Sequence, residues 1–248
     1  MVVYGINPVL EALRAGRVTA VRIGARGGGR MHELLSMAGE RGVNVQRVDA
    51  HLLDRLAKGG VHQGVVADVD EASVDYSVEE LVRDASGPAL ILVLDGIEDP
   101  HNLGAILRTA DAAGVHGVVV QNRRSAALGG AAAKASAGAV AHVKIAQVVN
   151  IARAIDELKA IGVWTVGLAD DAEMSYDAID FAVPSAIVVG AEGSGLRRLV
   201  REKCDFTARI PMQGHVSSLN VSVATGICLF EAVRQRIGGG AKPGKQRK

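Results

Sequence analysis

Short, almost wholly apolar segments recur along the second part of the chain, separated by stretches in which apolar positions follow a helical period. Strands of this kind, alternating with helices, are typical of a largely parallel sheet that helices cover on both faces. The predicted strands are ALILVLD (89–95), GVVVQ (117–121), HVKIA (142–146), WTVGLA (164–169), AIVVG (186–190) and FTARIP (206–211). The predicted helices cover residues 103–113, 131–137, 148–161 and 216–237.

The first part of the chain predicts a smaller α/β unit. Pro8 suits the first turn of a helix that runs to about residue 15, because its missing N–H does no harm there. Further along, the patterns predict strands over 18–25, 43–48 and 61–69 and helices over 32–41 and 50–57. An acidic stretch and Gly87-Pro88 follow, which is a boundary signal. We therefore expect a first domain over 1–72, a linker over 73–88, a second domain over 89–238 and a disordered basic tail over 239–248.

Composition narrows the possible functions. Hydrophobic residues make up 48% of the 248 residues, so the whole chain is not disordered. The net charge is +1 and aromatic residues are 3%, which argues against base-stacking platforms and means that any nucleic-acid role needs a local basic surface. Residues 1–60 carry nine Lys or Arg and five Asp or Glu, an excess of four positive charges. The candidates for such a nucleic-acid surface lie in basic loops that either bind phosphates or are only solvated: Arg26, Arg30, Arg123 and Arg124.

The chain carries no sign of a membrane or of an oxidising compartment. Its apolar runs are too short to span a bilayer, and the N-terminus lacks the basic start of a signal peptide. Cys204 and Cys228 have no metal-ligand spacing, so we expect two reduced, buried thiols. Glu98 and Asp99 are interpreted as a solvated turn, and the seven histidines show no paired spacing. We expect a cytoplasmic protein without a metal site.

Three polar segments follow predicted strands, at the sheet edge where open α/β sheets bind ligands. In the first, DGIEDPHNLGAILRTA (95–110), Asn102 suits the N-cap of a helix, and Arg108 is either a surface charge or an anion-binding group. The second, VVGAEGSGL (188–196), is a glycine-rich turn that lets a ligand approach the backbone. It matches neither a Walker loop nor the dinucleotide fingerprint. In the third, IPMQGHVSSLNVSVA (210–224), Ser218 and Asn220 either cap a helix or bind an anion or a ribose.

The three segments in this order resemble the SpoU family of the SPOUT superfamily, S-adenosylmethionine-dependent RNA 2′-O-ribose methyltransferases. The match runs over residues 89–237. The N-terminal unit, from YGINPVLEAL to GVHQGVVA, is similar to the substrate-binding domain of the branch that methylates a guanosine of 23S rRNA. The resemblance implies an α/β sheet with a deep C-terminal trefoil knot, a homodimer with the active site near its interface, a large-subunit rRNA substrate and S-adenosylmethionine as cofactor.

The resemblance also implies site residues. The catalytic set matches Asn102, Arg108, Glu192, Ser218 and Asn220. The cofactor set matches Gly190, Glu192, Gly195, Ile210, Met212, Ser218 and Leu219. Arg108 corresponds to the arginine assigned as general base, yet an arginine keeps its proton at ordinary pH. It either loses that proton with help from a substrate phosphate and Ser218, or it stabilises a developing alkoxide as a fixed cation.

Three alternatives stay open at this level. One is an RNA-binding ribosome assembly factor without methylation activity, although the complete catalytic set disfavours it. Another is a methyltransferase for a different rRNA site or for tRNA; the basic N-terminal unit favours a large folded RNA. A third is an NAD-binding metabolic enzyme, which the order of the glycines disfavours.

Overall fold

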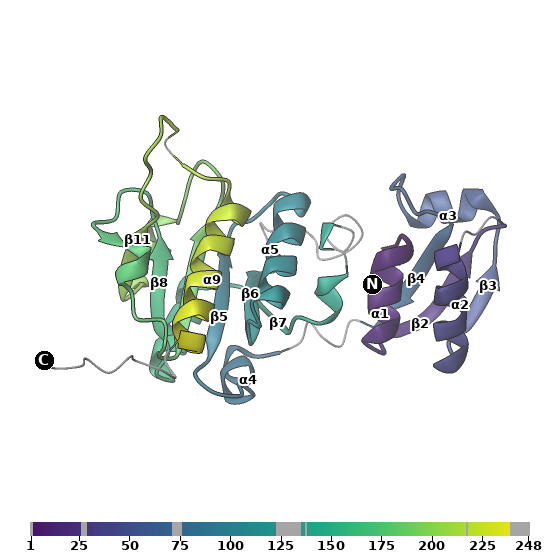
Figure 1. The fold of residues 1–248 in the computed structure, drawn as a ribbon, viewed down its shortest axis with the longest axis horizontal. Coiled ribbons are helices and arrows are strands. Elements are labelled where there is room, and N and C mark those ends of the chain that lie inside the picture. The colour runs from purple at the N-terminus through teal and green to yellow at the C-terminus, as the bar shows by residue number, and fades with distance from the viewer. Residues whose placement is uncertain are drawn as a thin grey trace, which may run out of the picture.

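The computed structural model describes residues 2–25, 29–70, 76–122, 135–136, 138–216 and 218–238 of the 248-residue chain. These residues form a four-stranded sheet in the N-terminal part and a seven-stranded sheet in the rest. Figure 1 shows the two sheets, each with its own helices, at opposite ends of the molecule. No helix among the described residues is long and apolar enough to cross a membrane.

The N-terminal sheet has the strand order β1-β4-β2-β3. Its elements are β1 (Val2–Tyr4), α1 (Ile6–Arg14), β2 (Val18–Ile23), α2 (Gly29–Glu40), β3 (Asn44–Arg47), α3 (Ala50–Leu56) and β4 (Val65–Val69). Strand β4 runs antiparallel to β1 and β2, while β2 and β3 are parallel. The strand expected from residue 61 begins only at Val65. Gln63, with a φ of +52°, turns the chain just before it and accepts a hydrogen bond from the Ile6 amide.

The larger sheet has the strand order β7-β6-β5-β10-β8-β11-β9, and every neighbouring pair is parallel. Its elements are α4 (Val78–Arg83), β5 (Leu90–Asp95), α5 (Pro100–Ala112), β6 (Gly117–Gln121), η2 (Ala139–Ala141), β7 (Ile145–Val148), α7 (Ile151–Ala160), β8 (Trp164–Leu168), β9 (Met174–Ser175), η3 (Tyr176–Ala178), β10 (Ser185–Gly190), α8 (Arg198–Lys203), β11 (Phe206–Arg209) and α9 (Val221–Gly238). The expected mixed α/β fold with a mostly parallel sheet is confirmed.

The central strands of this sheet are buried on both sides, so the side chains on both of its faces are apolar. Along β5, Leu92 and Leu94 pack into one cluster with residues of α5 and α9, whereas Ile91 and Val93 pack into another with residues of α4, α7 and α8. This alternation explains why the strand reads as an unbroken apolar run in the sequence.

Several element boundaries differ from the sequence-based expectation. The strand expected at 142–146 is β7, four residues long from Ile145, and the following helix starts at Ile151 because Asn150 caps it. The expected linker 73–88 contains α4, whose Ser77 and Glu80 form a capping box and whose Leu81 is fully buried. The predicted helix 131–137 lies almost entirely outside the described residues, and so does the tail 239–248.

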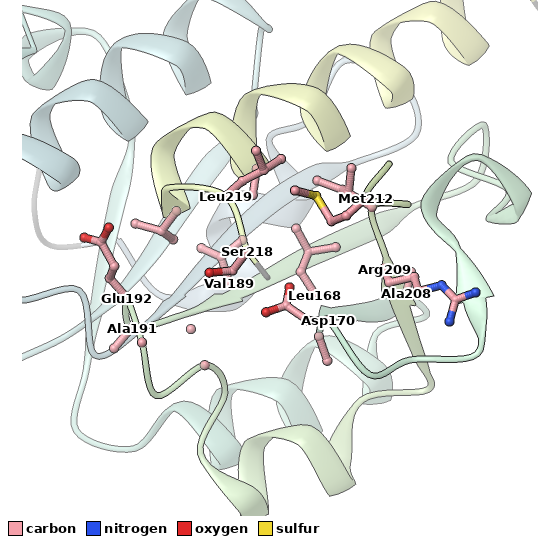
Figure 2. Close-up of a pocket in the computed structure, with 17 residues that line it drawn as sticks. Leu168, Asp170, Val189, Ala191, Glu192, Ala208, Arg209, Met212, Ser218 and Leu219 are labelled. Atoms are coloured by element: carbon pink, nitrogen blue, oxygen red, sulfur yellow. The ribbon is translucent and has the colours of Figure 1, made fainter. Parts of the chain in front are cut away.

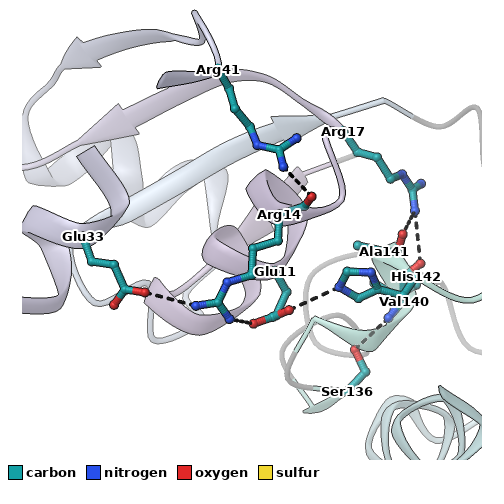
Figure 3. Close-up of polar contacts among 9 residues, drawn as sticks. All are labelled: Glu11, Arg14, Arg17, Glu33, Arg41, Ser136, Val140, Ala141 and His142. Carbon is teal, nitrogen blue, oxygen red and sulfur yellow. Dashed lines mark hydrogen bonds and ion pairs between the residues drawn. The ribbon is translucent and has the colours of Figure 1, made fainter. Parts of the chain in front are cut away.

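The two parts of the chain meet at the short η2 helix (Figure 3). The Arg17 guanidinium donates hydrogen bonds to the carbonyl oxygens of Ala141, at 2.8 Å, and Val140, at 3.3 Å. The His142 ring Nε2 lies 3.2 Å from a carboxylate oxygen of Glu11 on α1. Because η2 also packs against α5, it lies between the N-terminal part and a helix of the larger sheet.

Candidate active site

The carboxyl ends of β8, β10 and β11, together with the loop before α9, surround an open cleft of about 760 Å³ (Figure 2). Apolar side chains of Leu168, Val189 and Met212 and the polar groups of Asp170 and Glu192 share its wall. This mixture suits a ligand with a flat apolar part and several polar groups.

All residues expected to bind the cofactor line this cleft, although they come from three distant segments. They are Gly190, Glu192, Gly195, Ile210, Met212, Ser218 and Leu219. Sequence reasoning missed a further set of lining residues: Leu168, Ala169, Asp170, Val189, Ala191, Gly193, Ala208, Arg209, Val221 and Ala224. Asp170 could have been found from the sequence, because it directly follows a predicted strand at the ligand-binding edge of the sheet. The roles of all these residues stay predictions.

The glycine-rich turn after β10 folds back tightly on itself. The amides of Ala191 and Gly195 each donate to the carbonyl of the other, at 3.1 and 2.8 Å. The turn passes so close to Gly190 that a Cβ there would lie 2.1 Å from the Gly195 carbonyl carbon. Glycine at position 190 is therefore required by the approach of the backbone.

Three of the predicted catalytic residues form one hydrogen-bonded network beside the cleft. The Asn102 side-chain amide donates to a Glu192 carboxylate oxygen at 2.9 Å. The Asn220 amide donates to the Asn102 carbonyl oxygen at 3.0 Å and to the other Glu192 oxygen at 3.4 Å. Asn220 in turn accepts from the Ser222 amide at 3.0 Å. The network joins α5, the glycine-rich turn and the start of α9, and it fixes the orientation of all three side chains.

The network depends on helix starts that differ from the expectation. The side chain of Asp99, rather than Asn102, caps α5 by accepting from the His101 amide at 2.9 Å, and Pro100 is in the first turn. Asn102 is therefore a helical residue, 9% exposed, with its side chain free for the site. Helix α9 begins at Val221, five residues later than expected from 216, so Asn220 lies at its entrance.

A second cleft lies on the other side of the network. It is open to solvent and shares Ala191, Glu192 and Val221 with the first cleft. The rest of its wall comes from the loop between β5 and α5, which includes Glu98 and Asp99, with Asn102 at the start of the helix and Ser194. A group bound in either cleft would therefore contact the same Glu192.

Arg108 lies apart from the network. It is exposed on α5, lines neither cleft, and makes no hydrogen bond or ion pair with another described residue. Of the expected RNA-binding residues, Arg30 is exposed and donates to the Asn7 side chain at 2.6 Å, but it lies at the start of α2 and not in a loop. Arg26, Arg123 and Arg124 lie outside the described residues.

The cysteines and histidines take no part in the site. Burial raises the pKa of both Cys204 and Cys228 to about 12, and both thiols are free. Within the described ranges, no three His, Cys, Asp or Glu side chains gather in a way that could hold a metal ion.

The chain that carries this site matches the models of two known protein families. The model of the SpoU rRNA Methylase family matches residues 89–230. The chain belongs to the SpoU rRNA methylase family. A second model, for RNA 2′-O ribose methyltransferase substrate binding, matches residues 2–74 of this family member. The resemblance seen in the three motifs is thus confirmed.

Relatives of this SpoU family member align over nearly its whole length. A Burkholderia protein named 23S rRNA (guanosine-2′-O-)-methyltransferase RlmB is 48% identical, with 94% of this chain and 96% of the relative covered. A protein of the same name from Pseudomonas syringae is 46% identical, with 94% and 95% covered.

Solved structures agree with this placement. The SpoU methyltransferase AviRb from Streptomyces viridochromogenes, in complex with AdoMet, superposes with a TM-score of 0.81 at 27% identity, covering 96% of this chain and 91% of that one. The A. aeolicus TrmH/SpoU tRNA modifying enzyme has a TM-score of 0.57 at 32% identity, with 66% of this chain covered and 84% of that one.

Proposed function

We propose that this protein is an S-adenosylmethionine-dependent 2′-O-ribose methyltransferase that acts on a guanosine of 23S rRNA. The observation that carries the proposal is the cleft at the ends of β8, β10 and β11, bordered by the Asn102–Glu192–Asn220 network. The near-full-length relatives named RlmB support the rRNA guanosine as substrate.

The cleft fits S-adenosylmethionine by its chemistry. Leu168, Ile210 and Leu219 offer an apolar wall to an adenine ring, and the neighbouring backbone amides and carbonyls offer polar contacts. The carboxylates of Asp170 and Glu192 suit hydroxyl or ammonium groups. When bound, S-adenosylmethionine supplies a methyl group attached to a positively charged sulfur.

The chain's own residues would position the attacking ribose. The second cleft borders the first at Glu192, so a nucleoside there would lie beside the cofactor cleft. Asn102 and Asn220 are locked by Glu192 and hold fixed dipoles at this border, which favours a single orientation of the 2′-hydroxyl. Ser218, exposed in the loop before α9, would contact the cofactor or the ribose. Arg108 would stabilise the developing alkoxide as a cation or, after losing its own proton with help from a substrate phosphate and Ser218, would accept the proton of the 2′-hydroxyl.

In a homodimer, Arg108 of one subunit would lie at the cleft of the other subunit. Arg108 is exposed on α5, which packs beside α9, and α9 exposes Val223 and Phe230, each about 50% accessible. Apolar side chains on such a surface favour a protein contact. We place the dimer interface on this α5–α9 surface, so that Arg108 serves the partner's cleft. We also infer that the C-terminal part forms the trefoil knot; the insertion of β10 between β5 and β8 supports it.

The N-terminal part would bind the RNA. The proposed boundaries are a substrate-binding domain over 1–72, a linker over 73–88 that includes α4, and a catalytic domain over 89–238. The excess of basic residues in the first 60 residues supports RNA contact there, by attraction to phosphates. The protein would act in the cytoplasm, where it meets the large-subunit rRNA.

Methylation of purified RNA with radiolabelled S-adenosylmethionine tests the proposal. Unmodified 23S rRNA, 16S rRNA and tRNA are compared, and the product is mapped by ribose-methylation-sensitive sequencing. We expect label on one 23S guanosine. Label on tRNA or 16S rRNA would overturn the substrate assignment, and an absence of label on RNA and on precursor particles would overturn the activity.

Deletion of residues 1–72 tests whether the N-terminal part binds the RNA and the rest of the chain binds the cofactor. The truncated protein should bind S-adenosylmethionine as the full chain does and bind rRNA at least tenfold more weakly. Equal rRNA affinity would show that the catalytic domain binds the substrate alone.

A further inference from the structure

A buried carboxylate at the end of β5 lines neither of the two clefts. The Asp95 side chain is fully buried and accepts three hydrogen bonds from one residue, Arg197. One carboxylate oxygen accepts from the Arg197 backbone amide at 2.9 Å; the other accepts from Nε at 2.6 Å and from Nη2. The same Nη2 donates to the Gln121 side chain at the end of β6, at 2.8 Å.

The position of this pair relates it to the glycine-rich turn. Asp95 is the neighbour of Gly190 in the register of β5 and β10. The chain leaves the sheet at Gly190, turns over residues 191–196, and returns to place Arg197 on Asp95. The Asp95–Arg197 pair therefore closes the turn across two adjacent strand ends. Within the turn, Gly193 and Gly195 have φ values of +80° and +64°, a conformation that the closed ends help to hold.

The pair also connects the two segments that build the catalytic network. Asp95 directly precedes the loop that leads to α5 and Asn102. Arg197 directly follows the turn that carries Glu192. The 2.9 Å hydrogen bond between Asn102 and Glu192 spans these two segments. We propose that Asp95 and Arg197 form a positioning clamp that holds the turn, and Glu192 with it, in the geometry required for S-adenosylmethionine binding and methyl transfer. The clamp rests on the proposed function.

The chemistry of the pair suits positioning better than stability. The Asp95 side chain is fully buried whereas the Arg197 side chain is 42% exposed, and such a pair gains little stability because taking the carboxylate out of water is costly. An arginine bonded to a carboxylate through several donors fixes direction as well as distance. The neighbouring pair on α8, Arg198 with Glu202, is different: its side chains are 82% and 52% exposed, and it contacts neither strand end. Such exposed pairs contribute little.

Four variants test the clamp, with Arg198→Gln as the matched control. For Asp95→Asn and Arg197→Gln we expect the Kd for S-adenosylmethionine to rise at least tenfold and kcat on 23S rRNA to fall at least tenfold. In the protein without cofactor, backbone amides of residues 191–196 should exchange with deuterium at least tenfold faster. Arg197→Lys keeps the charge and should recover part of the affinity. Arg198→Gln should match the wild type in all three measurements.

The double variant Asp95→Asn/Arg197→Gln separates positioning from stability. Arg197→Gln alone leaves a buried carboxylate unpaired and should lower the melting temperature, whereas the double variant removes that charge and should regain most of the loss. Its cofactor affinity should stay low. Recovery of both stability and affinity would overturn the clamp and make the pair structural. If the wild type binds no S-adenosylmethionine, the proposed function fails; unchanged exchange at residues 191–196 in the single variants would overturn the clamp itself.

Discussion

The substitution Gly190→Ala should destroy the cofactor cleft while leaving most of the fold intact. An added Cβ would lie 2.1 Å from the Gly195 carbonyl carbon, 2.2 Å from its oxygen and 2.3 Å from the Leu196 nitrogen. All three are backbone atoms, which cannot rotate away as a flexible side chain would. Ordinary contact begins at 3.4 Å, so the turn must move by about 1.3 Å, the difference between 3.4 and 2.1 Å.

A displacement of that size acts on the site directly. The turn carries Glu192, whose 2.9 Å bond to Asn102 is lost if the two separate by much more than half an ångström. Overpacking of this kind lowers the free energy of unfolding by about 1–3 kcal/mol. Binding is weakened separately, because S-adenosylmethionine must hold the displaced turn in its binding geometry, and about 1.4 kcal/mol of lost binding free energy is tenfold in Kd. We therefore expect Gly190→Ala to weaken S-adenosylmethionine binding by at least about tenfold.

Calorimetric titration with S-adenosylmethionine and urea denaturation measure the two effects. Gly39→Ala is the matched control, because a Cβ at Gly39 in α2 meets no atom within 4 Å. It should stabilise the protein by about 0.5–1 kcal/mol, as alanine does in a helix, and leave the Kd unchanged. A Kd for Gly190→Ala within twofold of the wild type would refute the close approach of the turn.

Three further predictions follow from other parts of the molecule. Arg108→Ala should lower the rate of methyl transfer by about a hundredfold or more, as loss of a charge-stabilising group does. It should change the Kd for S-adenosylmethionine by less than threefold. A large loss of cofactor binding would instead assign Arg108 to the cleft. Burial and the Arg236 charge lower the pKa of His116, so the unfolded state takes up a proton there at a higher pH than the folded state. The free energy of unfolding should therefore fall as the pH drops below about 6.5, the ordinary pKa of histidine. His116→Asn should reduce this fall, measured by urea titrations at pH 7.5 and 5.5. An identical fall in the variant would contradict the prediction. Because burial raises the pKa of Cys204 and Cys228 to about 12, neither thiol should react with a thiol reagent at pH 8 until the protein unfolds, and rapid labelling of the native protein would count against their burial.

Most strands and helices, and their order, could be predicted from the amino-acid sequence. The apolar runs within β5, β6 and β10, at 90–94, 117–120 and 186–189, indicated buried strands because they are short and contain no polar position. Short or amphipathic elements were missed. Helix α4 lies in an acidic stretch, and its capping box at Ser77 and Glu80 was interpreted as part of a linker. Strand β1 has three residues and depends on pairing with β4, which no local pattern reveals.

The candidate site was found in part because its residues follow strand ends. Gly190, Ile210 and Leu219 line the expected cleft, and Asn102 and Asn220 lie in one network. Local propensity misplaced the start of α5, since both Asp99 and Asn102 are good caps and only the folded turn shows which one is used.

The sequence alone predicted most of the elements, the polar segments at the strand ends and the family, because these depend on patterns local to each stretch of chain. The tertiary structure decided which residues meet. Asp95 and Arg197 are 102 positions apart and have no common motif, yet strand register places the end of β5 beside Gly190 and brings the two side chains together. The exposure of Arg108, away from the clefts, was likewise decided by how α5 packs on the sheet. Contacts of this kind depend on long-range packing of the sheet, which no window of the sequence contains.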